Sequence, residues 1–288
     1  MKKLNRIVVG SLLGIAIGAA AGAQEMPAQP KVLQITREFV KTGKNGMAHE
    51  KSESAFVKAM SDAHWPTYYV ALSSLSGKTR VLFLTPYASF DAWQKDAEGV
   101  DKNATLSAAL DQAIEADGEL LDSVDQGVLL MREEMSLRPH PDLSQFRYLE
   151  ISGYHVKPGH TGEWREIVKM VKAAYEKALP DAHWGMFQLV YGGAGDTYLV
   201  LTGHKSLGEI DQGILQEKQF VEAMGEPGMK VLSEMISHCV DSSEHQLFAI
   251  NARMSYVPDS WKKADPDFWM PKEMPEAMKP AKEKKAKH

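Results

Sequence analysis

Asp62-Ala63-His64-Trp65 recurs as Asp181-Ala182-His183-Trp184, 119 residues further along the chain. That interval is about the length of one small domain. Each tetrapeptide follows a strand-like run, a glycine-containing turn and a helix-like stretch, and each precedes two short strand-like runs and a longer helical region. Met135-Ser136 recurs as Met254-Ser255 at the same interval. Repetition at a fixed interval indicates a duplicated unit.

The second copy of the unit has the clearer pattern. Residues 148–156 alternate as a strand does, and residues 157–160 form a turn around Pro158-Gly159. Residues 162–179 predict an amphipathic helix, because apolar side chains recur at three- and four-residue steps until Pro180. The remaining elements expected are a hairpin at 185–191 and 197–202, a short helix at 206–214, a longer helical region at 220–238 with a break at 225–228, and a closing strand at 247–256.

The first copy predicts the same order of elements. They are a strand at 32–40, a helix at 48–61 with Ala55, Phe56, Ala59 and Met60 inward, a hairpin at 66–73 and 79–85, a helix at 104–124 and a strand at 127–135. Each unit therefore reads β-α-β-β-α-β, the ferredoxin-like arrangement of two helices on one face of an antiparallel sheet. The bare sheet faces can cover each other. The expected α+β fold is two tandem ferredoxin-like units packed sheet to sheet, an intrachain pseudo-dimeric α/β barrel.

The two ends of the chain differ in composition from the repeats. Lys2, Lys3 and Arg6 precede an apolar run and a small-residue site at residues 21–23, which predicts a cleaved signal peptide at 1–23 and a periplasmic or secreted protein. The uncharged stretch is too short for a membrane span. We expect repeats at 31–137 and 146–257, a linker at 138–145, and a tail at 258–288 rich in proline and lysine. Trp261, Phe268 and Trp269 predict that this tail begins as an irregular strap across the body.

Charge and cysteine content exclude two further classes. The formal net charge of −5 becomes −8 without Lys2, Lys3 and Arg6, which argues against nucleic acid as a partner. Cys239 is the only cysteine, so an intrachain disulfide is excluded. A small buried thiol is the favoured interpretation of Cys239. Either a monomer or a homodimer is compatible with the pattern, because an exposed sheet edge can pair with a second copy.

One stretch carries a family resemblance, Tyr148-Leu-Glu-Ile-Ser-Gly-Tyr-His-Val-Lys-Pro-Gly-His-Thr-Gly-Glu-Trp164 with the helix behind it. A strand, then Val-Lys-Pro-Gly, then an aromatic residue entering a helix resembles the opening of domains in the dimeric α/β-barrel superfamily. That superfamily includes antibiotic-biosynthesis-type monooxygenases and NIPSNAP-like proteins. The resemblance covers residues 31–257 and implies the fold. Families of this type include cofactor-free oxygenases, haem-degrading enzymes, isomerases and members without known activity, so it implies no single chemistry.

The interior between the two sheets is the candidate ligand site. The candidate ligand-binding residues are His64, Trp65, His183, Trp184 and Tyr87. A structural role for the two His-Trp pairs is favoured, because each follows a helix and opens a strand, where an imidazole can hydrogen-bond to backbone and an indole can close the core. The alternative is a pair of related His-Trp sites that bind one ligand inside the barrel.

His155 and His204 are weak candidates for catalysis. If both project inward from neighbouring strands, they can supply a general base or hold haem or a metal ion. The chain contains no zinc signature, nucleophile elbow or Ser–His–Asp order, so no metal site is predicted.

Two functions follow from these patterns. The first is an exported, non-catalytic protein that binds a small apolar or aromatic ligand between its sheets and uses no cofactor. The second is a cofactor-independent monooxygenase or a haem-handling enzyme that uses His155 or His204. Imidazoles that share one closed pocket would favour the second function over the first.

Overall fold

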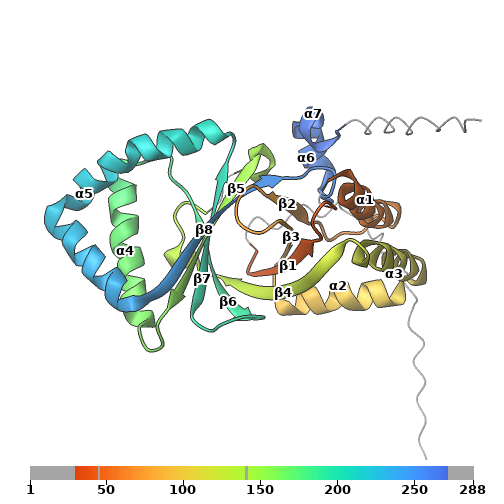
Figure 1. Cartoon of the computed structure of the whole chain (residues 1–288), viewed down its shortest axis with the longest axis horizontal. Helices are drawn as coiled ribbons and strands as arrows, with labels where there is room; N and C mark the ends of the chain where they lie inside the picture. Colours follow the sequence, from red (N-terminus) through yellow and green to blue (C-terminus); the bar gives the residue numbers. More distant parts are fainter. Residues whose placement is uncertain (1–29, 45, 140–141, 272–288) are drawn as a thin grey trace, which may run out of the picture.

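A computed structural model describes residues 30–44, 46–139 and 142–271, and its eight antiparallel strands close into a barrel (Figure 1). The strand order around the barrel is β1-β3-β2-β8-β5-β7-β6-β4. The strands are β1 (Val32–Val40), β2 (Val70–Ser74), β3 (Arg80–Tyr87), β4 (Leu121–Met131), β5 (Tyr148–Val156), β6 (Gly185–Tyr191), β7 (Thr197–His204) and β8 (Val240–Ile250). The expected signal peptide and residues 272–288 of the tail lie outside the described residues.

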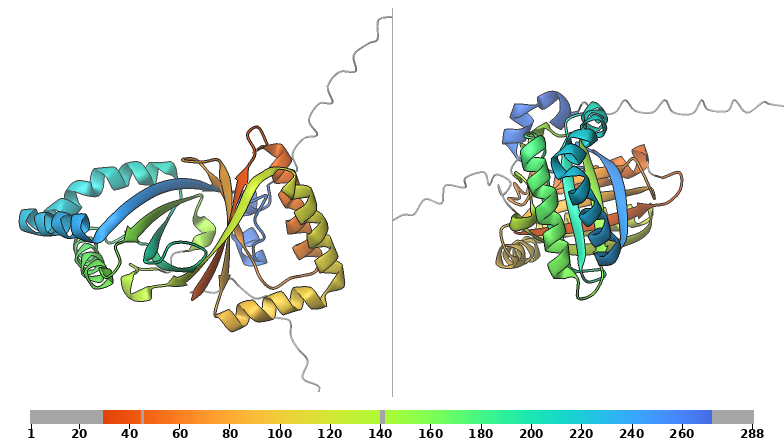
Figure 2. Two further views of the ribbon diagram at one scale, coloured as in Figure 1. Left: turned by 60° about the horizontal axis from the view of Figure 1, so that its bottom comes forward. Right: turned by 90° about the vertical axis from the view of Figure 1, so that its left-hand side faces the viewer.

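The helices lie outside the barrel, in two groups on opposite sides (Figure 2). They are α1 (Met47–Asp62), α2 (Phe90–Lys102) and α3 (Ala104–Gly118) on one side, and α4 (Thr161–Ala178) and α5 (Leu207–Cys239) on the other. The short helices α6 (Asp259–Ala264) and α7 (Pro266–Trp269) follow β8. The break predicted at residues 225–228 is confirmed, because α5 is kinked at Gly225, whose φ is +70°, just before Pro227.

Alternation along each strand separates two kinds of core. Inward side chains such as Leu33, Leu72 and Phe248 form one apolar cluster inside the barrel. Outward side chains of the first half pack against α1, and those of the second half pack against α4 and α5. The barrel interior is aliphatic with a few phenylalanines, so burial there contributes stability of about 25 cal/mol per Å² of apolar surface.

Hydrogen bonds join the first four strands to the last four at both seams. Leu72 pairs with Ile250 where β2 meets β8, and Met131 pairs with Phe187 where β4 meets β6. The expected units therefore meet edge to edge as well as across the interior. This closure leaves both half-sheets without a long free edge at the seams.

The repeated Met-Ser pair supports these seams. Ser136 Oγ accepts a hydrogen bond from the Met186 N–H at 2.9 Å, and Ser255 Oγ accepts one from the Ala71 N–H at 2.9 Å. The same hydroxyls donate to the carbonyls of Arg132 and Asn251. Each serine thus satisfies a backbone N–H of the opposite half of the barrel.

The closing strand of each unit begins earlier than predicted. The last strands are Leu121–Met131 and Val240–Ile250, not 127–135 and 247–256, and the helix expected to reach residue 124 ends at Gly118. The first half of each strand is exposed. With neither face buried, these segments lack the apolar alternation by which a strand is recognised. Helix α2 was also absent from the prediction.

Two further expectations were wrong. Ala55 is exposed, and His49 and Glu53 occupy the buried face of α1 together with Ala59. The start of the tail is helical, not irregular: α7 begins with Pro266 after the Asp265 cap and buries Trp269. Among the described residues, none of the helices combines the length and apolarity needed to cross a bilayer.

Candidate functional site

A cavity of about 320 Å³ opens at one end of the barrel. That end gathers the first residues of β1, β2, β5 and β6 and the last residues of β3, β4, β7 and β8, because the strands are antiparallel. The walls are mostly apolar and come from both halves of the chain: Leu33, Val70, Leu72, Leu84, Met131, Leu149, Phe187, Leu201 and Ile250. The cavity is also lined by Trp261 of α6 and by Leu143 and Phe146 of the connecting segment.

The second Asp-Ala-His-Trp copy lies at this cavity. His183 stacks on Phe146 with ring centroids 5.4 Å apart and an interplanar angle of 1°. Its Nε2 lies 3.2 Å from the Gly203 carbonyl oxygen, and its Nδ1 lies 3.1 Å from that of Asp181. Trp184 Nε1 donates to the Met135 carbonyl at 3.0 Å. The backbone role expected for this pair is therefore present, and both side chains also line the cavity.

Gly203 is required for that stacked pair. A Cβ atom at this position would lie 2.1 Å from the Phe146 ring. The ring occupies the space that a side chain on β7 would take, and it holds His183 against the cavity wall. A glycine inside a strand commonly marks such a close approach.

The first copy of the motif lies elsewhere, so the expected pair of related sites inside the barrel is not formed. His64 is exposed and has a φ of +48°, and it does not line the cavity. By strand register, the position equivalent to Phe146 is Pro30, which offers no aromatic ring for His64 to stack on.

Trp65 and Tyr87 line a separate hollow on the outside of the barrel. Trp65 Nε1, the Thr67 hydroxyl and the Tyr87 hydroxyl all donate to the carboxylate of Asp96 on α2. Burial, and then the charge of Asp96, raise the pKa of Tyr87. These three donors are already satisfied by one acceptor, which fixes α2 against the barrel.

The structure places His155 and His204 far apart. His155 is opposite Thr197 and lies 2.9 Å from its hydroxyl, whereas His204 is opposite Tyr148, seven residues earlier on β5. Seven residues span about 23 Å of strand. An odd separation also puts the two imidazoles on opposite faces of the sheet. The condition that both project into one interior is therefore not met, and neither lines the cavity.

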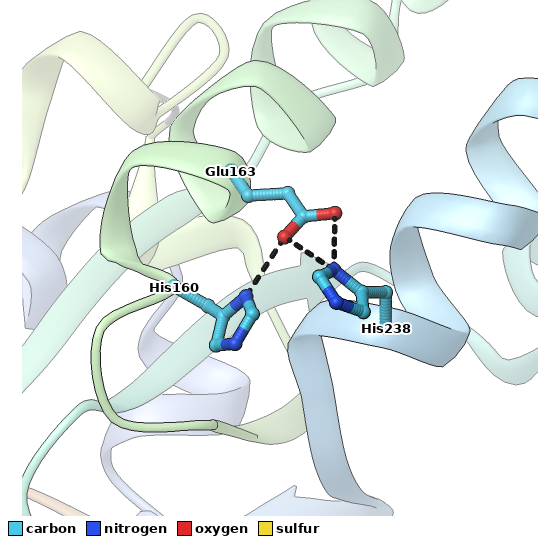
Figure 3. Close-up of side chains that lie close together, drawn as sticks. All are labelled: His160, Glu163 and His238. Atoms are coloured by element: carbon cyan, nitrogen blue, oxygen red, sulfur yellow. Dashed lines mark hydrogen bonds and ion pairs between the residues drawn. The ribbon is translucent and has the colours of Figure 1, made fainter.

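Two groups of ionisable side chains were not foreseen from the sequence. One is the triad His160, Glu163 and His238, which joins the start of α4 to the end of α5 (Figure 3). Glu163 Oε2 lies 2.9 Å from His160 Nδ1 and 3.0 Å from His238 Nδ1. Hydrogen bonding from His160, and then from His238, lowers the pKa of Glu163. In the sequence, the triad is indicated only by the three-residue step from His160 to Glu163.

The second unforeseen group comprises Glu38, His49, Glu53 and Asp117, and it is buried between β1, α1 and α3. Part of it was visible in the sequence, because His49 and Glu53 are four residues apart and share one helix face. Glu38 and Asp117 come from distant segments, which only the tertiary structure brings together.

Comparison with solved structures supports the fold. A candidate monooxygenase from Fusobacterium nucleatum subsp. nucleatum superposes with a TM-score of 0.51 and 10% identity, over 76% of this chain and 91% of that one. An anthrone oxidase-like protein gives 0.51 and 12%, over 78% and 93%. A chlorite dismutase from Candidatus Nitrospira defluvii gives a TM-score of 0.47 and 10% identity, over 83% and 97%.

These likenesses define the class of fold. The chain has the ferredoxin-like dimeric α/β-barrel fold. No family model matches the sequence, and no curated protein matches it.

Proposed function

We propose that this protein binds a small apolar or aromatic molecule in the cavity at the barrel end. The observation that carries the proposal is a cavity of about 320 Å³ with mostly apolar walls supplied by both halves. Ligand pockets in proteins are typically about 300–1,000 Å³, apolar and edged by a few polar groups. An engineered dry cavity of about 150 Å³ is large enough for benzene, so this volume suits a somewhat larger molecule.

The polar groups at the cavity support binding over catalysis. Both ring nitrogens of His183 face carbonyl oxygens, and the indole N–H of Trp184 is bonded to a carbonyl. Asp142 Oδ1 accepts hydrogen bonds from the N–H and hydroxyl of Ser144. A general base needs a lone pair within reach of the proton that it removes. These groups are engaged by the protein itself and are suited to orienting a ligand.

The test uses the apolar fluorophore N-phenyl-1-naphthylamine with the purified protein. We expect saturable binding at one site per chain, weakened at least tenfold by Leu84→Trp, which fills the cavity. Leu199→Trp is the matched control, because Leu199 belongs to the same interior cluster and does not line the cavity. Melting temperatures identify variants that fail to fold, and Leu84→Phe provides a smaller filling change. Unchanged binding by folded Leu84 variants would rule out this site.

A second candidate function is oxidation of a ring-bearing substrate in the same cavity. It is supported by two structural neighbours described as a candidate monooxygenase and an anthrone oxidase-like protein. Oxygen uptake with anthrone as the probe separates this function from simple binding. A visible spectrum with added haem tests the haem-handling version, and neither His155 nor His204 could bind the iron from the cavity wall, because neither lines it. The absence of a Soret shift removes that version.

We further propose that the two halves are copies of one unit. Support comes from β1 pairing with β4 in the register that β5 keeps with β8: Glu38 is opposite Val124, and Tyr154 is opposite Ser243. The seam serines Ser136 and Ser255 support it as well. Export through a cleaved signal peptide, and a monomer or homodimer as the assembly, stay predictions.

A further inference from the structure

A buried group of four ionisable side chains lies between the sheet and the helices of the first half. Glu38 comes from β1, His49 and Glu53 from α1, and Asp117 from α3. His49, Glu53 and Asp117 are 1%, 3% and 2% exposed. One nitrogen or oxygen atom from each of the four lies within 4.8 Å of the others. Burying three carboxyl groups together is costly unless a cation compensates them.

His49 makes one hydrogen bond within this group, with Glu38, and its other two contacts are longer. His49 Nε2 lies 3.2 Å from Glu38 Oε2, 3.5 Å from Asp117 Oδ1 and 3.8 Å from Glu53 Oε1. Ligand atoms about 2.0–2.2 Å from a tetrahedral metal ion lie about 3.3–3.6 Å from one another. The partly exposed triad of Figure 3 provides the contrast, because its closest nitrogen–oxygen distances of 2.9 and 3.0 Å are ordinary hydrogen bonds. In the buried group, the oxygens of Asp117 and Glu53 stand off from His49 Nε2 by 3.5 and 3.8 Å, close to the spacing of ligands around one ion.

Several polar atoms of the group lack partners. Glu53 Oε1, Asp117 Oδ1 and the neighbouring Tyr69 hydroxyl are buried without a hydrogen bond from any part of the chain that the structure describes. Buried polar atoms are nearly always paired, so unpaired ones require an explanation. Within the same described ranges, His49 is the only basic side chain in ion-pair range of Glu38, Glu53 and Asp117.

The fold itself does not require charges at this place. By strand register, the position of Glu38 in the first half corresponds to that of Tyr154 in the second. Tyr154 packs on Trp164 with ring centroids 5.1 Å apart, within an apolar cluster against α4 and α5. An apolar core therefore serves the same architecture in the second half. The carboxylates of the first half call for a specific role.

We propose that Glu38, His49, Glu53 and Asp117 bind one divalent transition-metal ion, such as Zn²⁺ or Mn²⁺. One imidazole with three carboxylates is a ligand set that suits these ions. Four protein ligands in a closed shell are typical of a structural site. The ion would tie α1 and α3 to β1 and would compensate the negative charge there. This site lies outside the barrel and is independent of the ligand proposed for the cavity.

The experiment measures metal binding by the full protein. After treatment with a chelator and dialysis, Zn²⁺ and Mn²⁺ are added separately, and stoichiometry is read by native mass spectrometry. Thermal unfolding is followed with and without each ion. The Co²⁺ visible spectrum of the unmodified chain reports whether a nitrogen and oxygen shell forms. Variants are Glu53→Gln, Asp117→Asn and Glu38→Gln, which remove one carboxylate from α1, α3 or β1.

We expect one ion per chain, a melting temperature that rises with added metal, and affinity at least 100-fold weaker in each folded variant. His238→Gln is the matched control, because it alters the triad of Figure 3 and should leave this binding unchanged. If one variant fails to fold, the other two carry the test, and the Co²⁺ spectrum needs no variant. The proposal is overturned if the unmodified chain binds no ion stoichiometrically. It is equally overturned if His238→Gln abolishes binding that the carboxylate variants retain.

Discussion

At the scale of single residues, the same residue type plays different roles in the two halves. His183 lines the cavity and stacks on a ring, whereas His64 is exposed at a left-handed backbone position. The tetrapeptide around them is identical. What differs is the surroundings, since Phe146 is provided by the segment between the halves and has Pro30 as its counterpart. A motif therefore identifies a place in the fold and leaves its chemistry to the neighbours.

Gly192 allows a direct test of how a hairpin turn meets β4. Its φ is +84°, and a Cβ atom there would lie 2.0 Å from the Gln126 carbonyl oxygen. Gly159 has a φ of +87° and no atom within 4 Å of an added Cβ. We expect Gly159→Ala to cost about 1–2 kcal/mol of unfolding free energy through backbone strain alone. Gly192→Ala should cost more, because backbone must also move. Urea denaturation measures the loss of unfolding free energy in both variants. Equal losses would show that the turn at Gly192 moves away from β4 at no cost.

Glu163 predicts a pH dependence at the triad of Figure 3. Its pKa is lowered in the folded protein, chiefly by the hydrogen bond from His160. The stabilisation is therefore present above the ordinary glutamate pKa and is lost as the pH falls through the lower, folded value. Glu163→Gln should reduce stability at neutral pH and should flatten the loss in acid. Urea midpoints between pH 3 and pH 7 measure this, with Glu166→Gln on the same helix as the control. Parallel pH profiles for Glu163→Gln and the unmodified protein would contradict it.

At the scale of elements, closure of the barrel depends on two pairs of strands that are not consecutive in the chain. β2 and β8 are neighbours, as are β4 and β6, and no turn connects either pair. Local periodicity predicts which residues form strands, but the seams need a partner more than 50 residues away. The recurring serines mark those seams in the sequence.

Ser136→Ala and Ser255→Ala test the seams. Each removes the acceptor of a buried backbone N–H, on Met186 and on Ala71. Leaving such a donor unpaired costs about 1–3 kcal/mol. We expect each change to lower the free energy of unfolding by that amount and the double change to sum both. Ser54→Ala is the control, since its hydroxyl donates to Lys51 on an exposed helix turn. Changes no larger than the control's would show that the hydroxyls are dispensable.

At the scale of the whole molecule, the C-terminal helices α6 and α7 contact both the cavity and the segment that precedes β5. Trp269 is buried, and its Nε1 donates to the Ser144 carbonyl at 3.0 Å. Arg147 pairs with Asp265 and lies over the Phe268 ring at 3.9 Å. Trp261 packs on Trp269 and reaches the cavity. The same anchor therefore holds part of the cavity wall in place.

Trp269→Ala tests that anchor. Removing a buried tryptophan side chain costs about 3–5 kcal/mol when its site stays folded. We expect the segment after β8 to detach and trypsin to cut faster after Lys262 and Lys263 of α6. Limited proteolysis with mass spectrometry follows those cuts, and Asp267→Ala, at an exposed position of the same segment, is the control. Equal cleavage in all three proteins would mean that Trp269 does not hold the segment.

The sequence by itself determined the order of most strands and helices, the kink near Gly225, and two residues of the cavity, His183 and Trp184. These depend on local periodicity and turn chemistry, which act over a few neighbouring residues. Only the tertiary structure decided that His155 and His204 lie at opposite ends of the paired strands β5 and β7. It also decided that four residues of β1, α1 and α3 meet in one buried group: Glu38, His49, Glu53 and Asp117. The physical reason is that strand register decides on which face of the sheet, and at which end of the barrel, a side chain lies. A shift of a single residue reverses the side that a side chain occupies, and register is set by partners distant in the chain.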